Sequence, residues 1–258
     1  MVKFNLWLWM VTFIICLSLN VEAAIESTCE FSTQKYASTL SKKNRVPLFV
    51  ERAQFTEDTK SFLENLYLDR KKKFLRAIKE APLRCPVEVK KAQMIVSKLL
   101  KNSEAKSLNS VELDVVVLCS KEQMPPIARL MAGKLLLLPI SLFKKSKSDA
   151  HMAAVIAHEI AHLALFHYGR LRQAISDSNF KISRVDVSEI KKIHEDEADL
   201  TSLELLASAG YDPLKAVEHL KHVHELKDEK INETSKLSTH RPFESRLAFL
   251  NTQISNCY

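Results

Sequence analysis

Two histidines four residues apart, with a glutamate directly after the first, form the clearest chemical pattern in the sequence. His158, Glu159 and His162 belong to the segment HEIAH. On an α-helix, residues i and i+4 lie on one face, so both imidazoles could bind the same cation. Glu159 would lie one step around the helix, within reach of a water on that cation. Two imidazoles suit zinc, and a carboxylate beside the water can act as a general base. The pattern therefore predicts a hydrolytic metal site.

The apolar surroundings of this segment argue against a chance pattern on a solvated helix. Residues 150–157 and 163–166 are mostly apolar, which predicts a helix that is buried on nearly all sides. Buried histidine and glutamate side chains require partners. Those partners could be a metal ion or a hydrogen-bonded network within the core, and we favour the metal.

Glu195 is the best candidate for the third protein ligand that a catalytic zinc requires. It begins the segment EDEAD and a predicted helix over residues 195–210. Asp199 lies four residues later and shares its face, so it could accept a hydrogen bond from a zinc-binding histidine. The alternative is an exposed helix start, because acidic side chains are favoured in the first turn of a helix.

These segments, in this order, resemble the HtpX/BepA-type zinc metallopeptidases of peptidase family M forty-eight. The family pattern is HExxH, then ExxAD, then a C-terminal THP segment followed by arginine and an apolar residue. The corresponding segments here are 158–162, 195–199 and 238–242, with Arg246 and Leu247 after the last. The tract 131–139 resembles the family's edge strand before the active-site helix. The resemblance extends from about residue 86 to residue 250.

The resemblance implies a role for each matching residue. The three ligands of one Zn²⁺ would be His158, His162 and Glu195. Glu159 would be the catalytic base. Asp199 would not bind the metal but would accept a hydrogen bond from one of the ligands. His240 and Arg246 match C-terminal site residues that act near the metal or the oxyanion, so both are candidate catalytic residues. The other histidines are predicted to be structural or solvated, namely His151, His167, His194, His219, His222 and His224.

The sequence departs from the family pattern at three points. The gap between His162 and Glu195 is shorter than the family leads us to expect, which predicts a trimmed loop or hairpin beside the cleft. Arg241 occupies a position where proline is usual. The chain has only three glycines, and the tract 131–139 lacks glycines that are common there. These departures affect the shape of the cleft, and none of them removes a ligand.

The first 23 residues read as a secretory signal peptide. Residues 6–19 are almost wholly apolar and are followed by a small residue at the expected cleavage position, after Ala23. An uncleaved membrane anchor is the alternative, although the apolar run is short for a transmembrane helix. The mature chain would retain Cys29, Cys85, Cys119 and Cys257. In an oxidising compartment these predict two disulfides with three pairings open, and buried free thiols are the alternative.

The basic composition does not indicate a nucleic-acid partner. The formal net charge is +7, but the lysines and arginines are dispersed and no nucleic-acid-binding motif accompanies them. A solvated basic surface accounts for this charge. Peripheral association with an anionic membrane surface is a further option. The sequence does not specify an oligomeric state.

Residues 24–258 are predicted to form a single metallopeptidase domain. The expected fold is a mainly helical α+β domain of the zincin (gluzincin) type, with a small antiparallel sheet beside the HExxH helix. Strands are predicted over 111–118 and 134–139. Besides the HExxH helix and the 195–210 helix, the predicted helices are 50–80, 86–101, 214–226 and 242–251.

The sequence as a whole predicts an exported zinc endopeptidase, with the periplasm as its expected location and a secreted or membrane-associated protein as the alternatives. The resemblance further implies a role in quality control of envelope or misfolded proteins. An extended protein or peptide substrate could pair with residues 134–139, if these form an edge strand. One alternative is a chaperone-like or binding protein that keeps the zinc fold with little proteolysis. Another is a structural or latent metal site that His240 closes as a fourth ligand.

Overall fold

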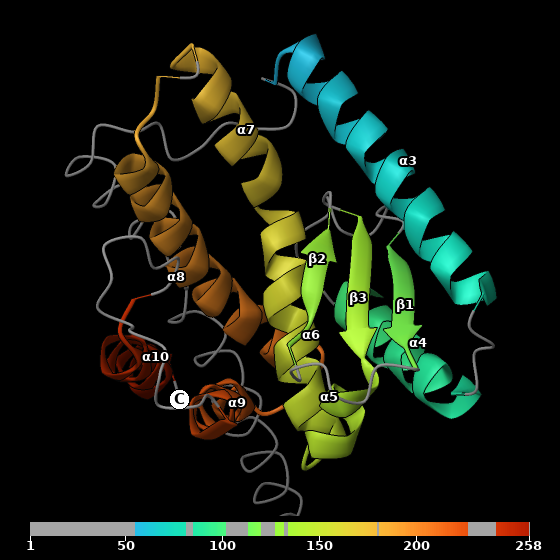
Figure 1. Ribbon diagram of the computed structural model, residues 1–258. Helices are drawn as coiled ribbons and strands as arrows, with labels where there is room; N and C mark the ends of the chain where they lie inside the picture. The colour runs from blue at the N-terminus through green and yellow to red at the C-terminus, as the bar shows by residue number, and fades with distance from the viewer. Residues whose placement is uncertain are drawn as a thin grey trace, which may run out of the picture.

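A buried helix and a three-stranded sheet form the centre of the fold (Figure 1). The computed structural model describes residues 55–80, 85–101, 113–119, 127–131, 134–179, 181–226 and 241–257. The elements in chain order are α3 (Glu57–Glu80), α4 (Pro86–Lys101), β1 (Asp114–Leu118), β2 (Arg129–Met131), β3 (Leu135–Pro139), α5 (Ile140–Lys145), α6 (Asp149–Ala164), α7 (His167–Asp177), α8 (Arg184–Ser208), α9 (Leu214–Leu226) and α10 (Phe243–Cys257). The predicted mainly helical α+β class is confirmed.

The sheet is mixed, so the prediction of an antiparallel sheet is wrong in part. Its strand order is β1-β3-β2, with β3 parallel to β1 and antiparallel to β2. The tract 134–139 was expected at an edge, but it forms the central strand. The edge strand on the side of α6 is β2, as Figure 1 shows. With only three residues, β2 is too short to produce an alternating pattern that the sequence could reveal.

The central strand is buried on both faces. Leu136 and Leu138 pack into the main core, together with residues of α4 and α6. Leu135 and Leu137 face the opposite side, where Tyr67 of α3 packs against them. Side chains alternate along a strand, so an unbroken run of leucines is what a strand covered on both sides requires.

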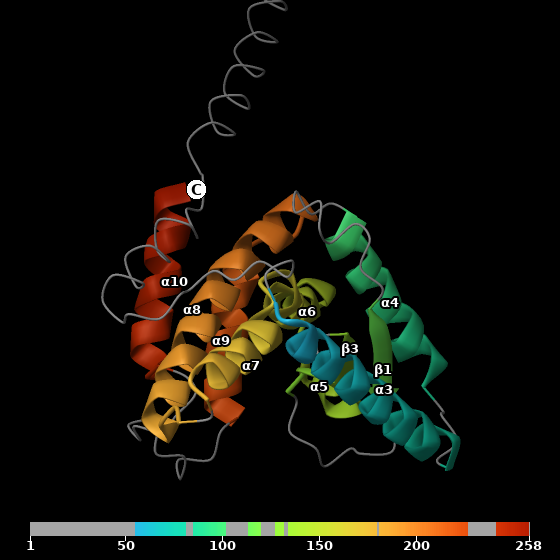
Figure 2. The same cartoon turned by 90° about the horizontal axis from the view of Figure 1, so that it is seen from above.

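The HExxH helix, α6, is buried as its sequence predicts. Met152, Ile156 and Ile160 are fully inaccessible to solvent. Ser148 caps the helix, because its side-chain oxygen accepts a hydrogen bond from the backbone N–H of His151 at 3.1 Å. α8 and α9 pack on α6 opposite the sheet, and α10 packs on α8 and α9 (Figures 1 and 2). α6 is thus enclosed between the sheet and the C-terminal helices.

α8 is longer than the predicted helix, which changes the position of Glu195. The helix begins at Arg184, where Ser183 and Asp186 form a reciprocal capping box. Glu195 therefore lies in the middle of α8, and the interpretation of its acidic segment as a helix start is wrong. The predicted end of this helix is close to the observed one, with Gly210 in the left-handed conformation at φ 67°.

A disulfide joins Cys85, at the start of α4, to Cys119, at the end of β1. This bond confirms one disulfide of the two predicted, and it leaves Cys29 and Cys257 as the remaining pair. Cys29 and the predicted signal peptide lie outside the described residues. Within the described residues, we find no helix that is both long and apolar enough to cross a membrane.

Candidate metal centre

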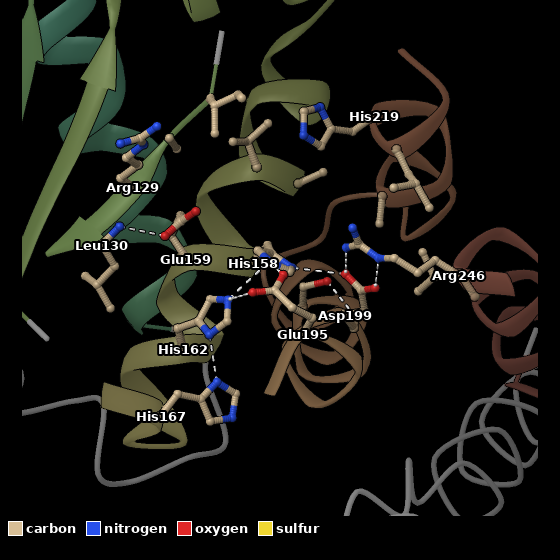
Figure 3. A pocket seen from close by; sticks show the side chains of 18 of the residues that line it. Arg129, Leu130, His158, Glu159, His162, His167, Glu195, Asp199, His219 and Arg246 are labelled. Carbon is tan, nitrogen blue, oxygen red and sulfur yellow. Dashed lines mark hydrogen bonds and ion pairs between the residues drawn. The ribbon is translucent and has the colours of Figure 1, made fainter. Parts of the chain in front are cut away.

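The three predicted zinc ligands come together at the contact between α6 and α8. The Nε2 atom of His158 lies 3.2 Å from Nε2 of His162 and 3.3 Å from Oε2 of Glu195. The Nε2 atom of His162 lies 3.5 Å from Oε1 of Glu195. Figure 3 shows both imidazoles and the carboxylate pointing toward one another. Two histidines of α6 and a glutamate of α8, far apart in sequence, thus bring their donor atoms to one place.

This donor set has the dimensions of a zinc site. Zinc binds histidine nitrogen and carboxylate oxygen at about 2.0–2.1 Å, and ligands at that radius in a tetrahedron are about 3.3–3.4 Å apart. The two ring nitrogens lie 3.2 Å apart, and each lies 3.3–3.5 Å from one of the two carboxylate oxygens of Glu195, which is close to that edge length. Two nitrogen donors and one carboxylate are also the ligand types that catalytic zinc sites use. The residues therefore fit one Zn²⁺ and leave a fourth position for water or substrate.

Acidic groups around His158 favour a cation at this place. Asp199 accepts a hydrogen bond from Nδ1 of His158 at 3.1 Å, on the side opposite Glu195. Burial disfavours a charged imidazole, but the two carboxylates outweigh it and raise the pKa of His158 to about 10. A metal ion at Nε2 would take the place of that positive charge, and its binding would release a proton.

Arg246 contacts Asp199 rather than the predicted metal ligands. Its Nε donates to Oδ2 of Asp199 at 2.8 Å, and its Nη2 donates to Oδ1 at 2.7 Å. Although burial of Asp199 opposes ionisation, Arg246 and His158 hold the pKa of its carboxyl well below the usual range. Arg246 also lines the cleft described below. Arg246 therefore reaches His158 only through Asp199. A direct action of Arg246 on the oxyanion stays a prediction.

Glu159 lies beside the ligands and points toward the sheet (Figure 3). Its Oε2 accepts a hydrogen bond from the backbone N–H of Leu130, in β2, at 2.6 Å. Burial raises the pKa of Glu159 to about 7, despite opposing effects from His158 and the Leu130 N–H. A carboxylate with a pKa near neutrality is suited to accept and then return a proton.

The ligands and Glu159 open onto a cleft of about 510 Å³. Beside them, its wall is formed by small and apolar side chains of α6, α9 and α10, namely Ala154, Val155, Ala216, Leu220 and Leu250. His219 is also in the wall, where burial and then the nearby His151 lower its pKa to about 3, so it stays neutral. A cleft of this size can hold several atoms of a substrate on either side of the metal.

Two C-terminal residues named from the sequence have different outcomes. His240 lies outside the described residues, so its role stays a prediction. Arg241, found where proline is usual in the resemblance, donates from Nε to the buried carboxylate of Asp196. The arginine thus ties the start of the C-terminal segment to α8.

His167, predicted from the sequence to be structural or solvated, is buried and makes a contact that the sequence did not reveal. Its Nδ1 lies 2.7 Å from Nδ1 of His162, the outer nitrogen of a predicted ligand. In a continuous helix, residues five apart lie about 140° from each other, so the spacing alone gave no reason to pair them. The sequence could have predicted this contact only by showing that the helix ends between His162 and His167. No proline or glycine lies between these two histidines to mark that end.

Comparison with known families agrees with this site. Residues 86–187 match the model of peptidase family M48. The match includes the HExxH helix and ends before Glu195, so the third ligand rests on geometry. A search of the curated proteins finds no similar sequence. Over residues 86–187 the chain is therefore similar to peptidase family M48, and the His158, His162 and Glu195 cluster is that of a zinc metallopeptidase.

Proposed function

We propose that this protein is an exported zinc-dependent endopeptidase that hydrolyses internal peptide bonds of proteins or peptides. The observation that carries the proposal is the convergence of His158, His162 and Glu195, whose nitrogen and oxygen atoms lie 3.2–3.5 Å apart, close to the edge of a zinc tetrahedron. Glu159 stands beside this donor set at the wall of the cleft. The arrangement supplies the two components of metal-assisted hydrolysis, a metal position and a base.

The residues of the chain would divide the reaction between them. When bound, zinc would polarise the peptide carbonyl and make a water molecule more acidic. Glu159 would accept one proton from that water as its oxygen bonds to the carbonyl carbon. Glu159 would then donate the proton to the amide nitrogen as the C–N bond breaks, which leaves a neutral amine. Asp199 would keep His158 oriented throughout, through the bond to Nδ1.

The edge strand β2 offers a place for an extended substrate. The N–H of Leu130 donates to Glu159, so it points away from β3 and toward the open edge of the sheet. Within a strand, the C=O of the same residue points in the same direction. A peptide chain could therefore add to this edge as a further strand, with no need for a free terminus. This mode favours cleavage within a chain over removal of terminal residues.

Substrate pairing would also release the base. A peptide carbonyl that accepts from the Leu130 N–H competes with Oε2 of Glu159, which accepts from the same group. Its displacement would let the carboxylate turn from β2 toward the attacking water. Glu159 would thus be available when the cleft is filled.

The proposed location and biological role rest on separate support. The apolar N-terminal segment favours export to the periplasm, and the Cys85–Cys119 disulfide is typical of an oxidising compartment. Unfolded envelope proteins present the extended, partly apolar segments that suit an edge strand beside an apolar cleft. Quality control of such proteins is therefore the role we propose, with peripheral contact to the membrane surface as an optional feature.

A blocked peptide tests the reaction directly. The mature chain, loaded with about one zinc, is incubated with casein and with peptides acetylated and amidated at their ends. We expect internal cleavage that a chelator abolishes. Glu159→Gln should retain zinc and fold while losing at least about 10²-fold in rate, the lower range for general-base catalysis. Binding of unfolded protein without cleavage would favour the chaperone-like alternative, and a variant with nearly full activity would exclude Glu159 as the base.

A further inference from the structure

A line of hydrogen bonds runs from the predicted ligand His162 into the protein interior. Nδ1 of His162 contacts Nδ1 of His167 at 2.7 Å, and Nε2 of His167 lies 2.9 Å from Oε2 of Glu197. Arg170 then donates to both carboxylate oxygens of Glu197, at 2.8 and 3.4 Å. The side chains beyond His162 are almost fully buried, with exposures of 2–5%. This line is separate from the one through Asp199 and Arg246 that supports His158.

The positions of the protons follow from the partners. A histidine that binds a metal through Nε2 carries its proton on Nδ1, so His162 must be the donor to His167. His167 then accepts at Nδ1 and carries its own proton on Nε2, which it donates to Glu197. Arg170 donates two hydrogen bonds to the carboxyl group of Glu197, which leaves that group as an acceptor for His167. Every donor in the line therefore faces an acceptor.

The backbone breaks at the position that makes this contact possible. α6 ends at Ala164, and α7 begins at His167 after Phe166 adopts a left-handed conformation with φ 52° and ψ 32°. A bulky residue rarely adopts this conformation, and it costs about 1 kcal/mol or more. The break turns His167 back toward His162 (Figure 3), whereas a continuous helix would direct it elsewhere.

A second metal site is the competing interpretation of this cluster. His167, His194 and Glu197 offer donor atoms within 4.8 Å of one another. However, the guanidinium of Arg170 already occupies the carboxylate of Glu197 with a positive charge. Both ring nitrogens of His167 are also engaged, one with His162 and one with Glu197. A dication here would have to displace a buried arginine, so the cluster does not suit a metal.

We propose that His167 is a positioning residue for the zinc ligand His162, fixing its tautomer and ring orientation through Glu197 and Arg170. This inference rests on the zinc site of the proposed function. The two zinc-binding histidines would then be held in the same manner from different sides. On each side, an acidic side chain of α8 that is paired with an arginine would anchor the outer nitrogen of the ring. Asp199 would accept a hydrogen bond directly from His158, and Glu197 would accept one from His167, which in turn accepts from His162.

The stacked pair His167 and His194 provides a matched test. Their rings lie 4.2 Å apart and nearly parallel, and both are buried. His194 has no hydrogen bond with a ligand in the described part of the chain, so His194→Phe controls for burial and stacking. His167→Phe keeps the ring and removes both hydrogen bonds. His167→Gln can still accept from His162 and donate to Glu197.

The readouts are zinc affinity by chelator competition, the visible spectrum of the Co²⁺-loaded protein, and the unfolding midpoint of the metal-free protein. We expect His167→Phe to weaken zinc binding about 10–100-fold, the usual effect of losing a partner of a metal-binding histidine. Its Co²⁺ bands should shift, because the ring of His162 is no longer fixed. His167→Gln should recover most of the affinity, and His194→Phe should bind one zinc like the parent.

Equal zinc affinity and an unchanged Co²⁺ spectrum in His167→Phe would overturn the proposal. Equal losses of zinc affinity in His167→Phe and His194→Phe would also overturn it, because they would indicate a packing role. A second bound metal in the parent that both variants lose would overturn it as well. If His167→Phe does not fold, His167→Met replaces it with the same expected outcomes. None of these measurements requires peptide cleavage, so the inference can hold even if the parent protein proves inactive as an endopeptidase.

Discussion

Replacing Arg246 with methionine separates two roles for this residue, support of Asp199 and direct catalysis. The methionine keeps most of the aliphatic volume and removes the guanidinium. In the parent, Arg246 and Asp199 are 13% and 6% exposed and share two hydrogen bonds of 2.7 and 2.8 Å. The substitution would leave Asp199 buried with His158 as its remaining partner.

The size of the effect follows from this burial. Removing one partner of a buried ion pair costs about 3–5 kcal/mol, because the other charge stays desolvated. Since His158 still bonds Asp199, we expect the lower end, about 3 kcal/mol, for the metal-free protein. Zinc binding should weaken about 10-fold or more, as His158 loses part of its support. Direct stabilisation of an oxyanion would instead reduce the rate about 10²–10³-fold with zinc affinity unchanged.

Denaturant unfolding in the presence of chelator measures the first quantity without a contribution from metal. Chelator competition and a steady-state peptide assay measure the other two. Arg76→Met, which removes an exposed arginine of α3, controls for the loss of a positive charge. The reasoning from geometry would be refuted if Arg246→Met unfolded within about 1 kcal/mol of the parent, well below the cost of breaking a buried ion pair, and bound zinc equally well.

Three further predictions concern other parts of the chain. His240→Ala should raise basal or self-cleaving activity if His240 closes the metal site, and should lower the rate about 10²–10³-fold if it stabilises the oxyanion; an unchanged rate would make it an ordinary loop histidine. Non-reducing peptide mapping should find Cys29 joined to Cys257, since Cys85 pairs with Cys119, and two free thiols there would contradict this. Burial opposes ionisation of Asp114, but hydrogen bonds from Lys71 and Tyr67 lower its pKa, so its stabilising effect is present above about pH 4 and lost below. Asp114→Asn should therefore lose less stability than the parent on acid titration from about pH 4 downward, and parallel curves would exclude this contribution.

The sequence alone determined the local parts of the candidate site. A spacing of four residues places His158 and His162 on one face of any α-helix, and the apolar residues around them predict that the helix is buried. Glu195 and Asp199 follow the same rule. The helix 214–226 was predicted with its observed bounds, because its pattern and the preceding glycine and proline are local signals.

Tertiary structure decided everything that depends on contacts between distant segments. The edge of the sheet at the cleft is formed by β2 rather than β3, because strand order depends on which segments pair and not on their composition. Arg246 contacts Asp199 only because α10 packs on α8. His167 meets His162 because the chain turns at Phe166, and no residue type there announces the turn. A helix period fixes which neighbours share a face, but only the packed chain fixes which faces meet.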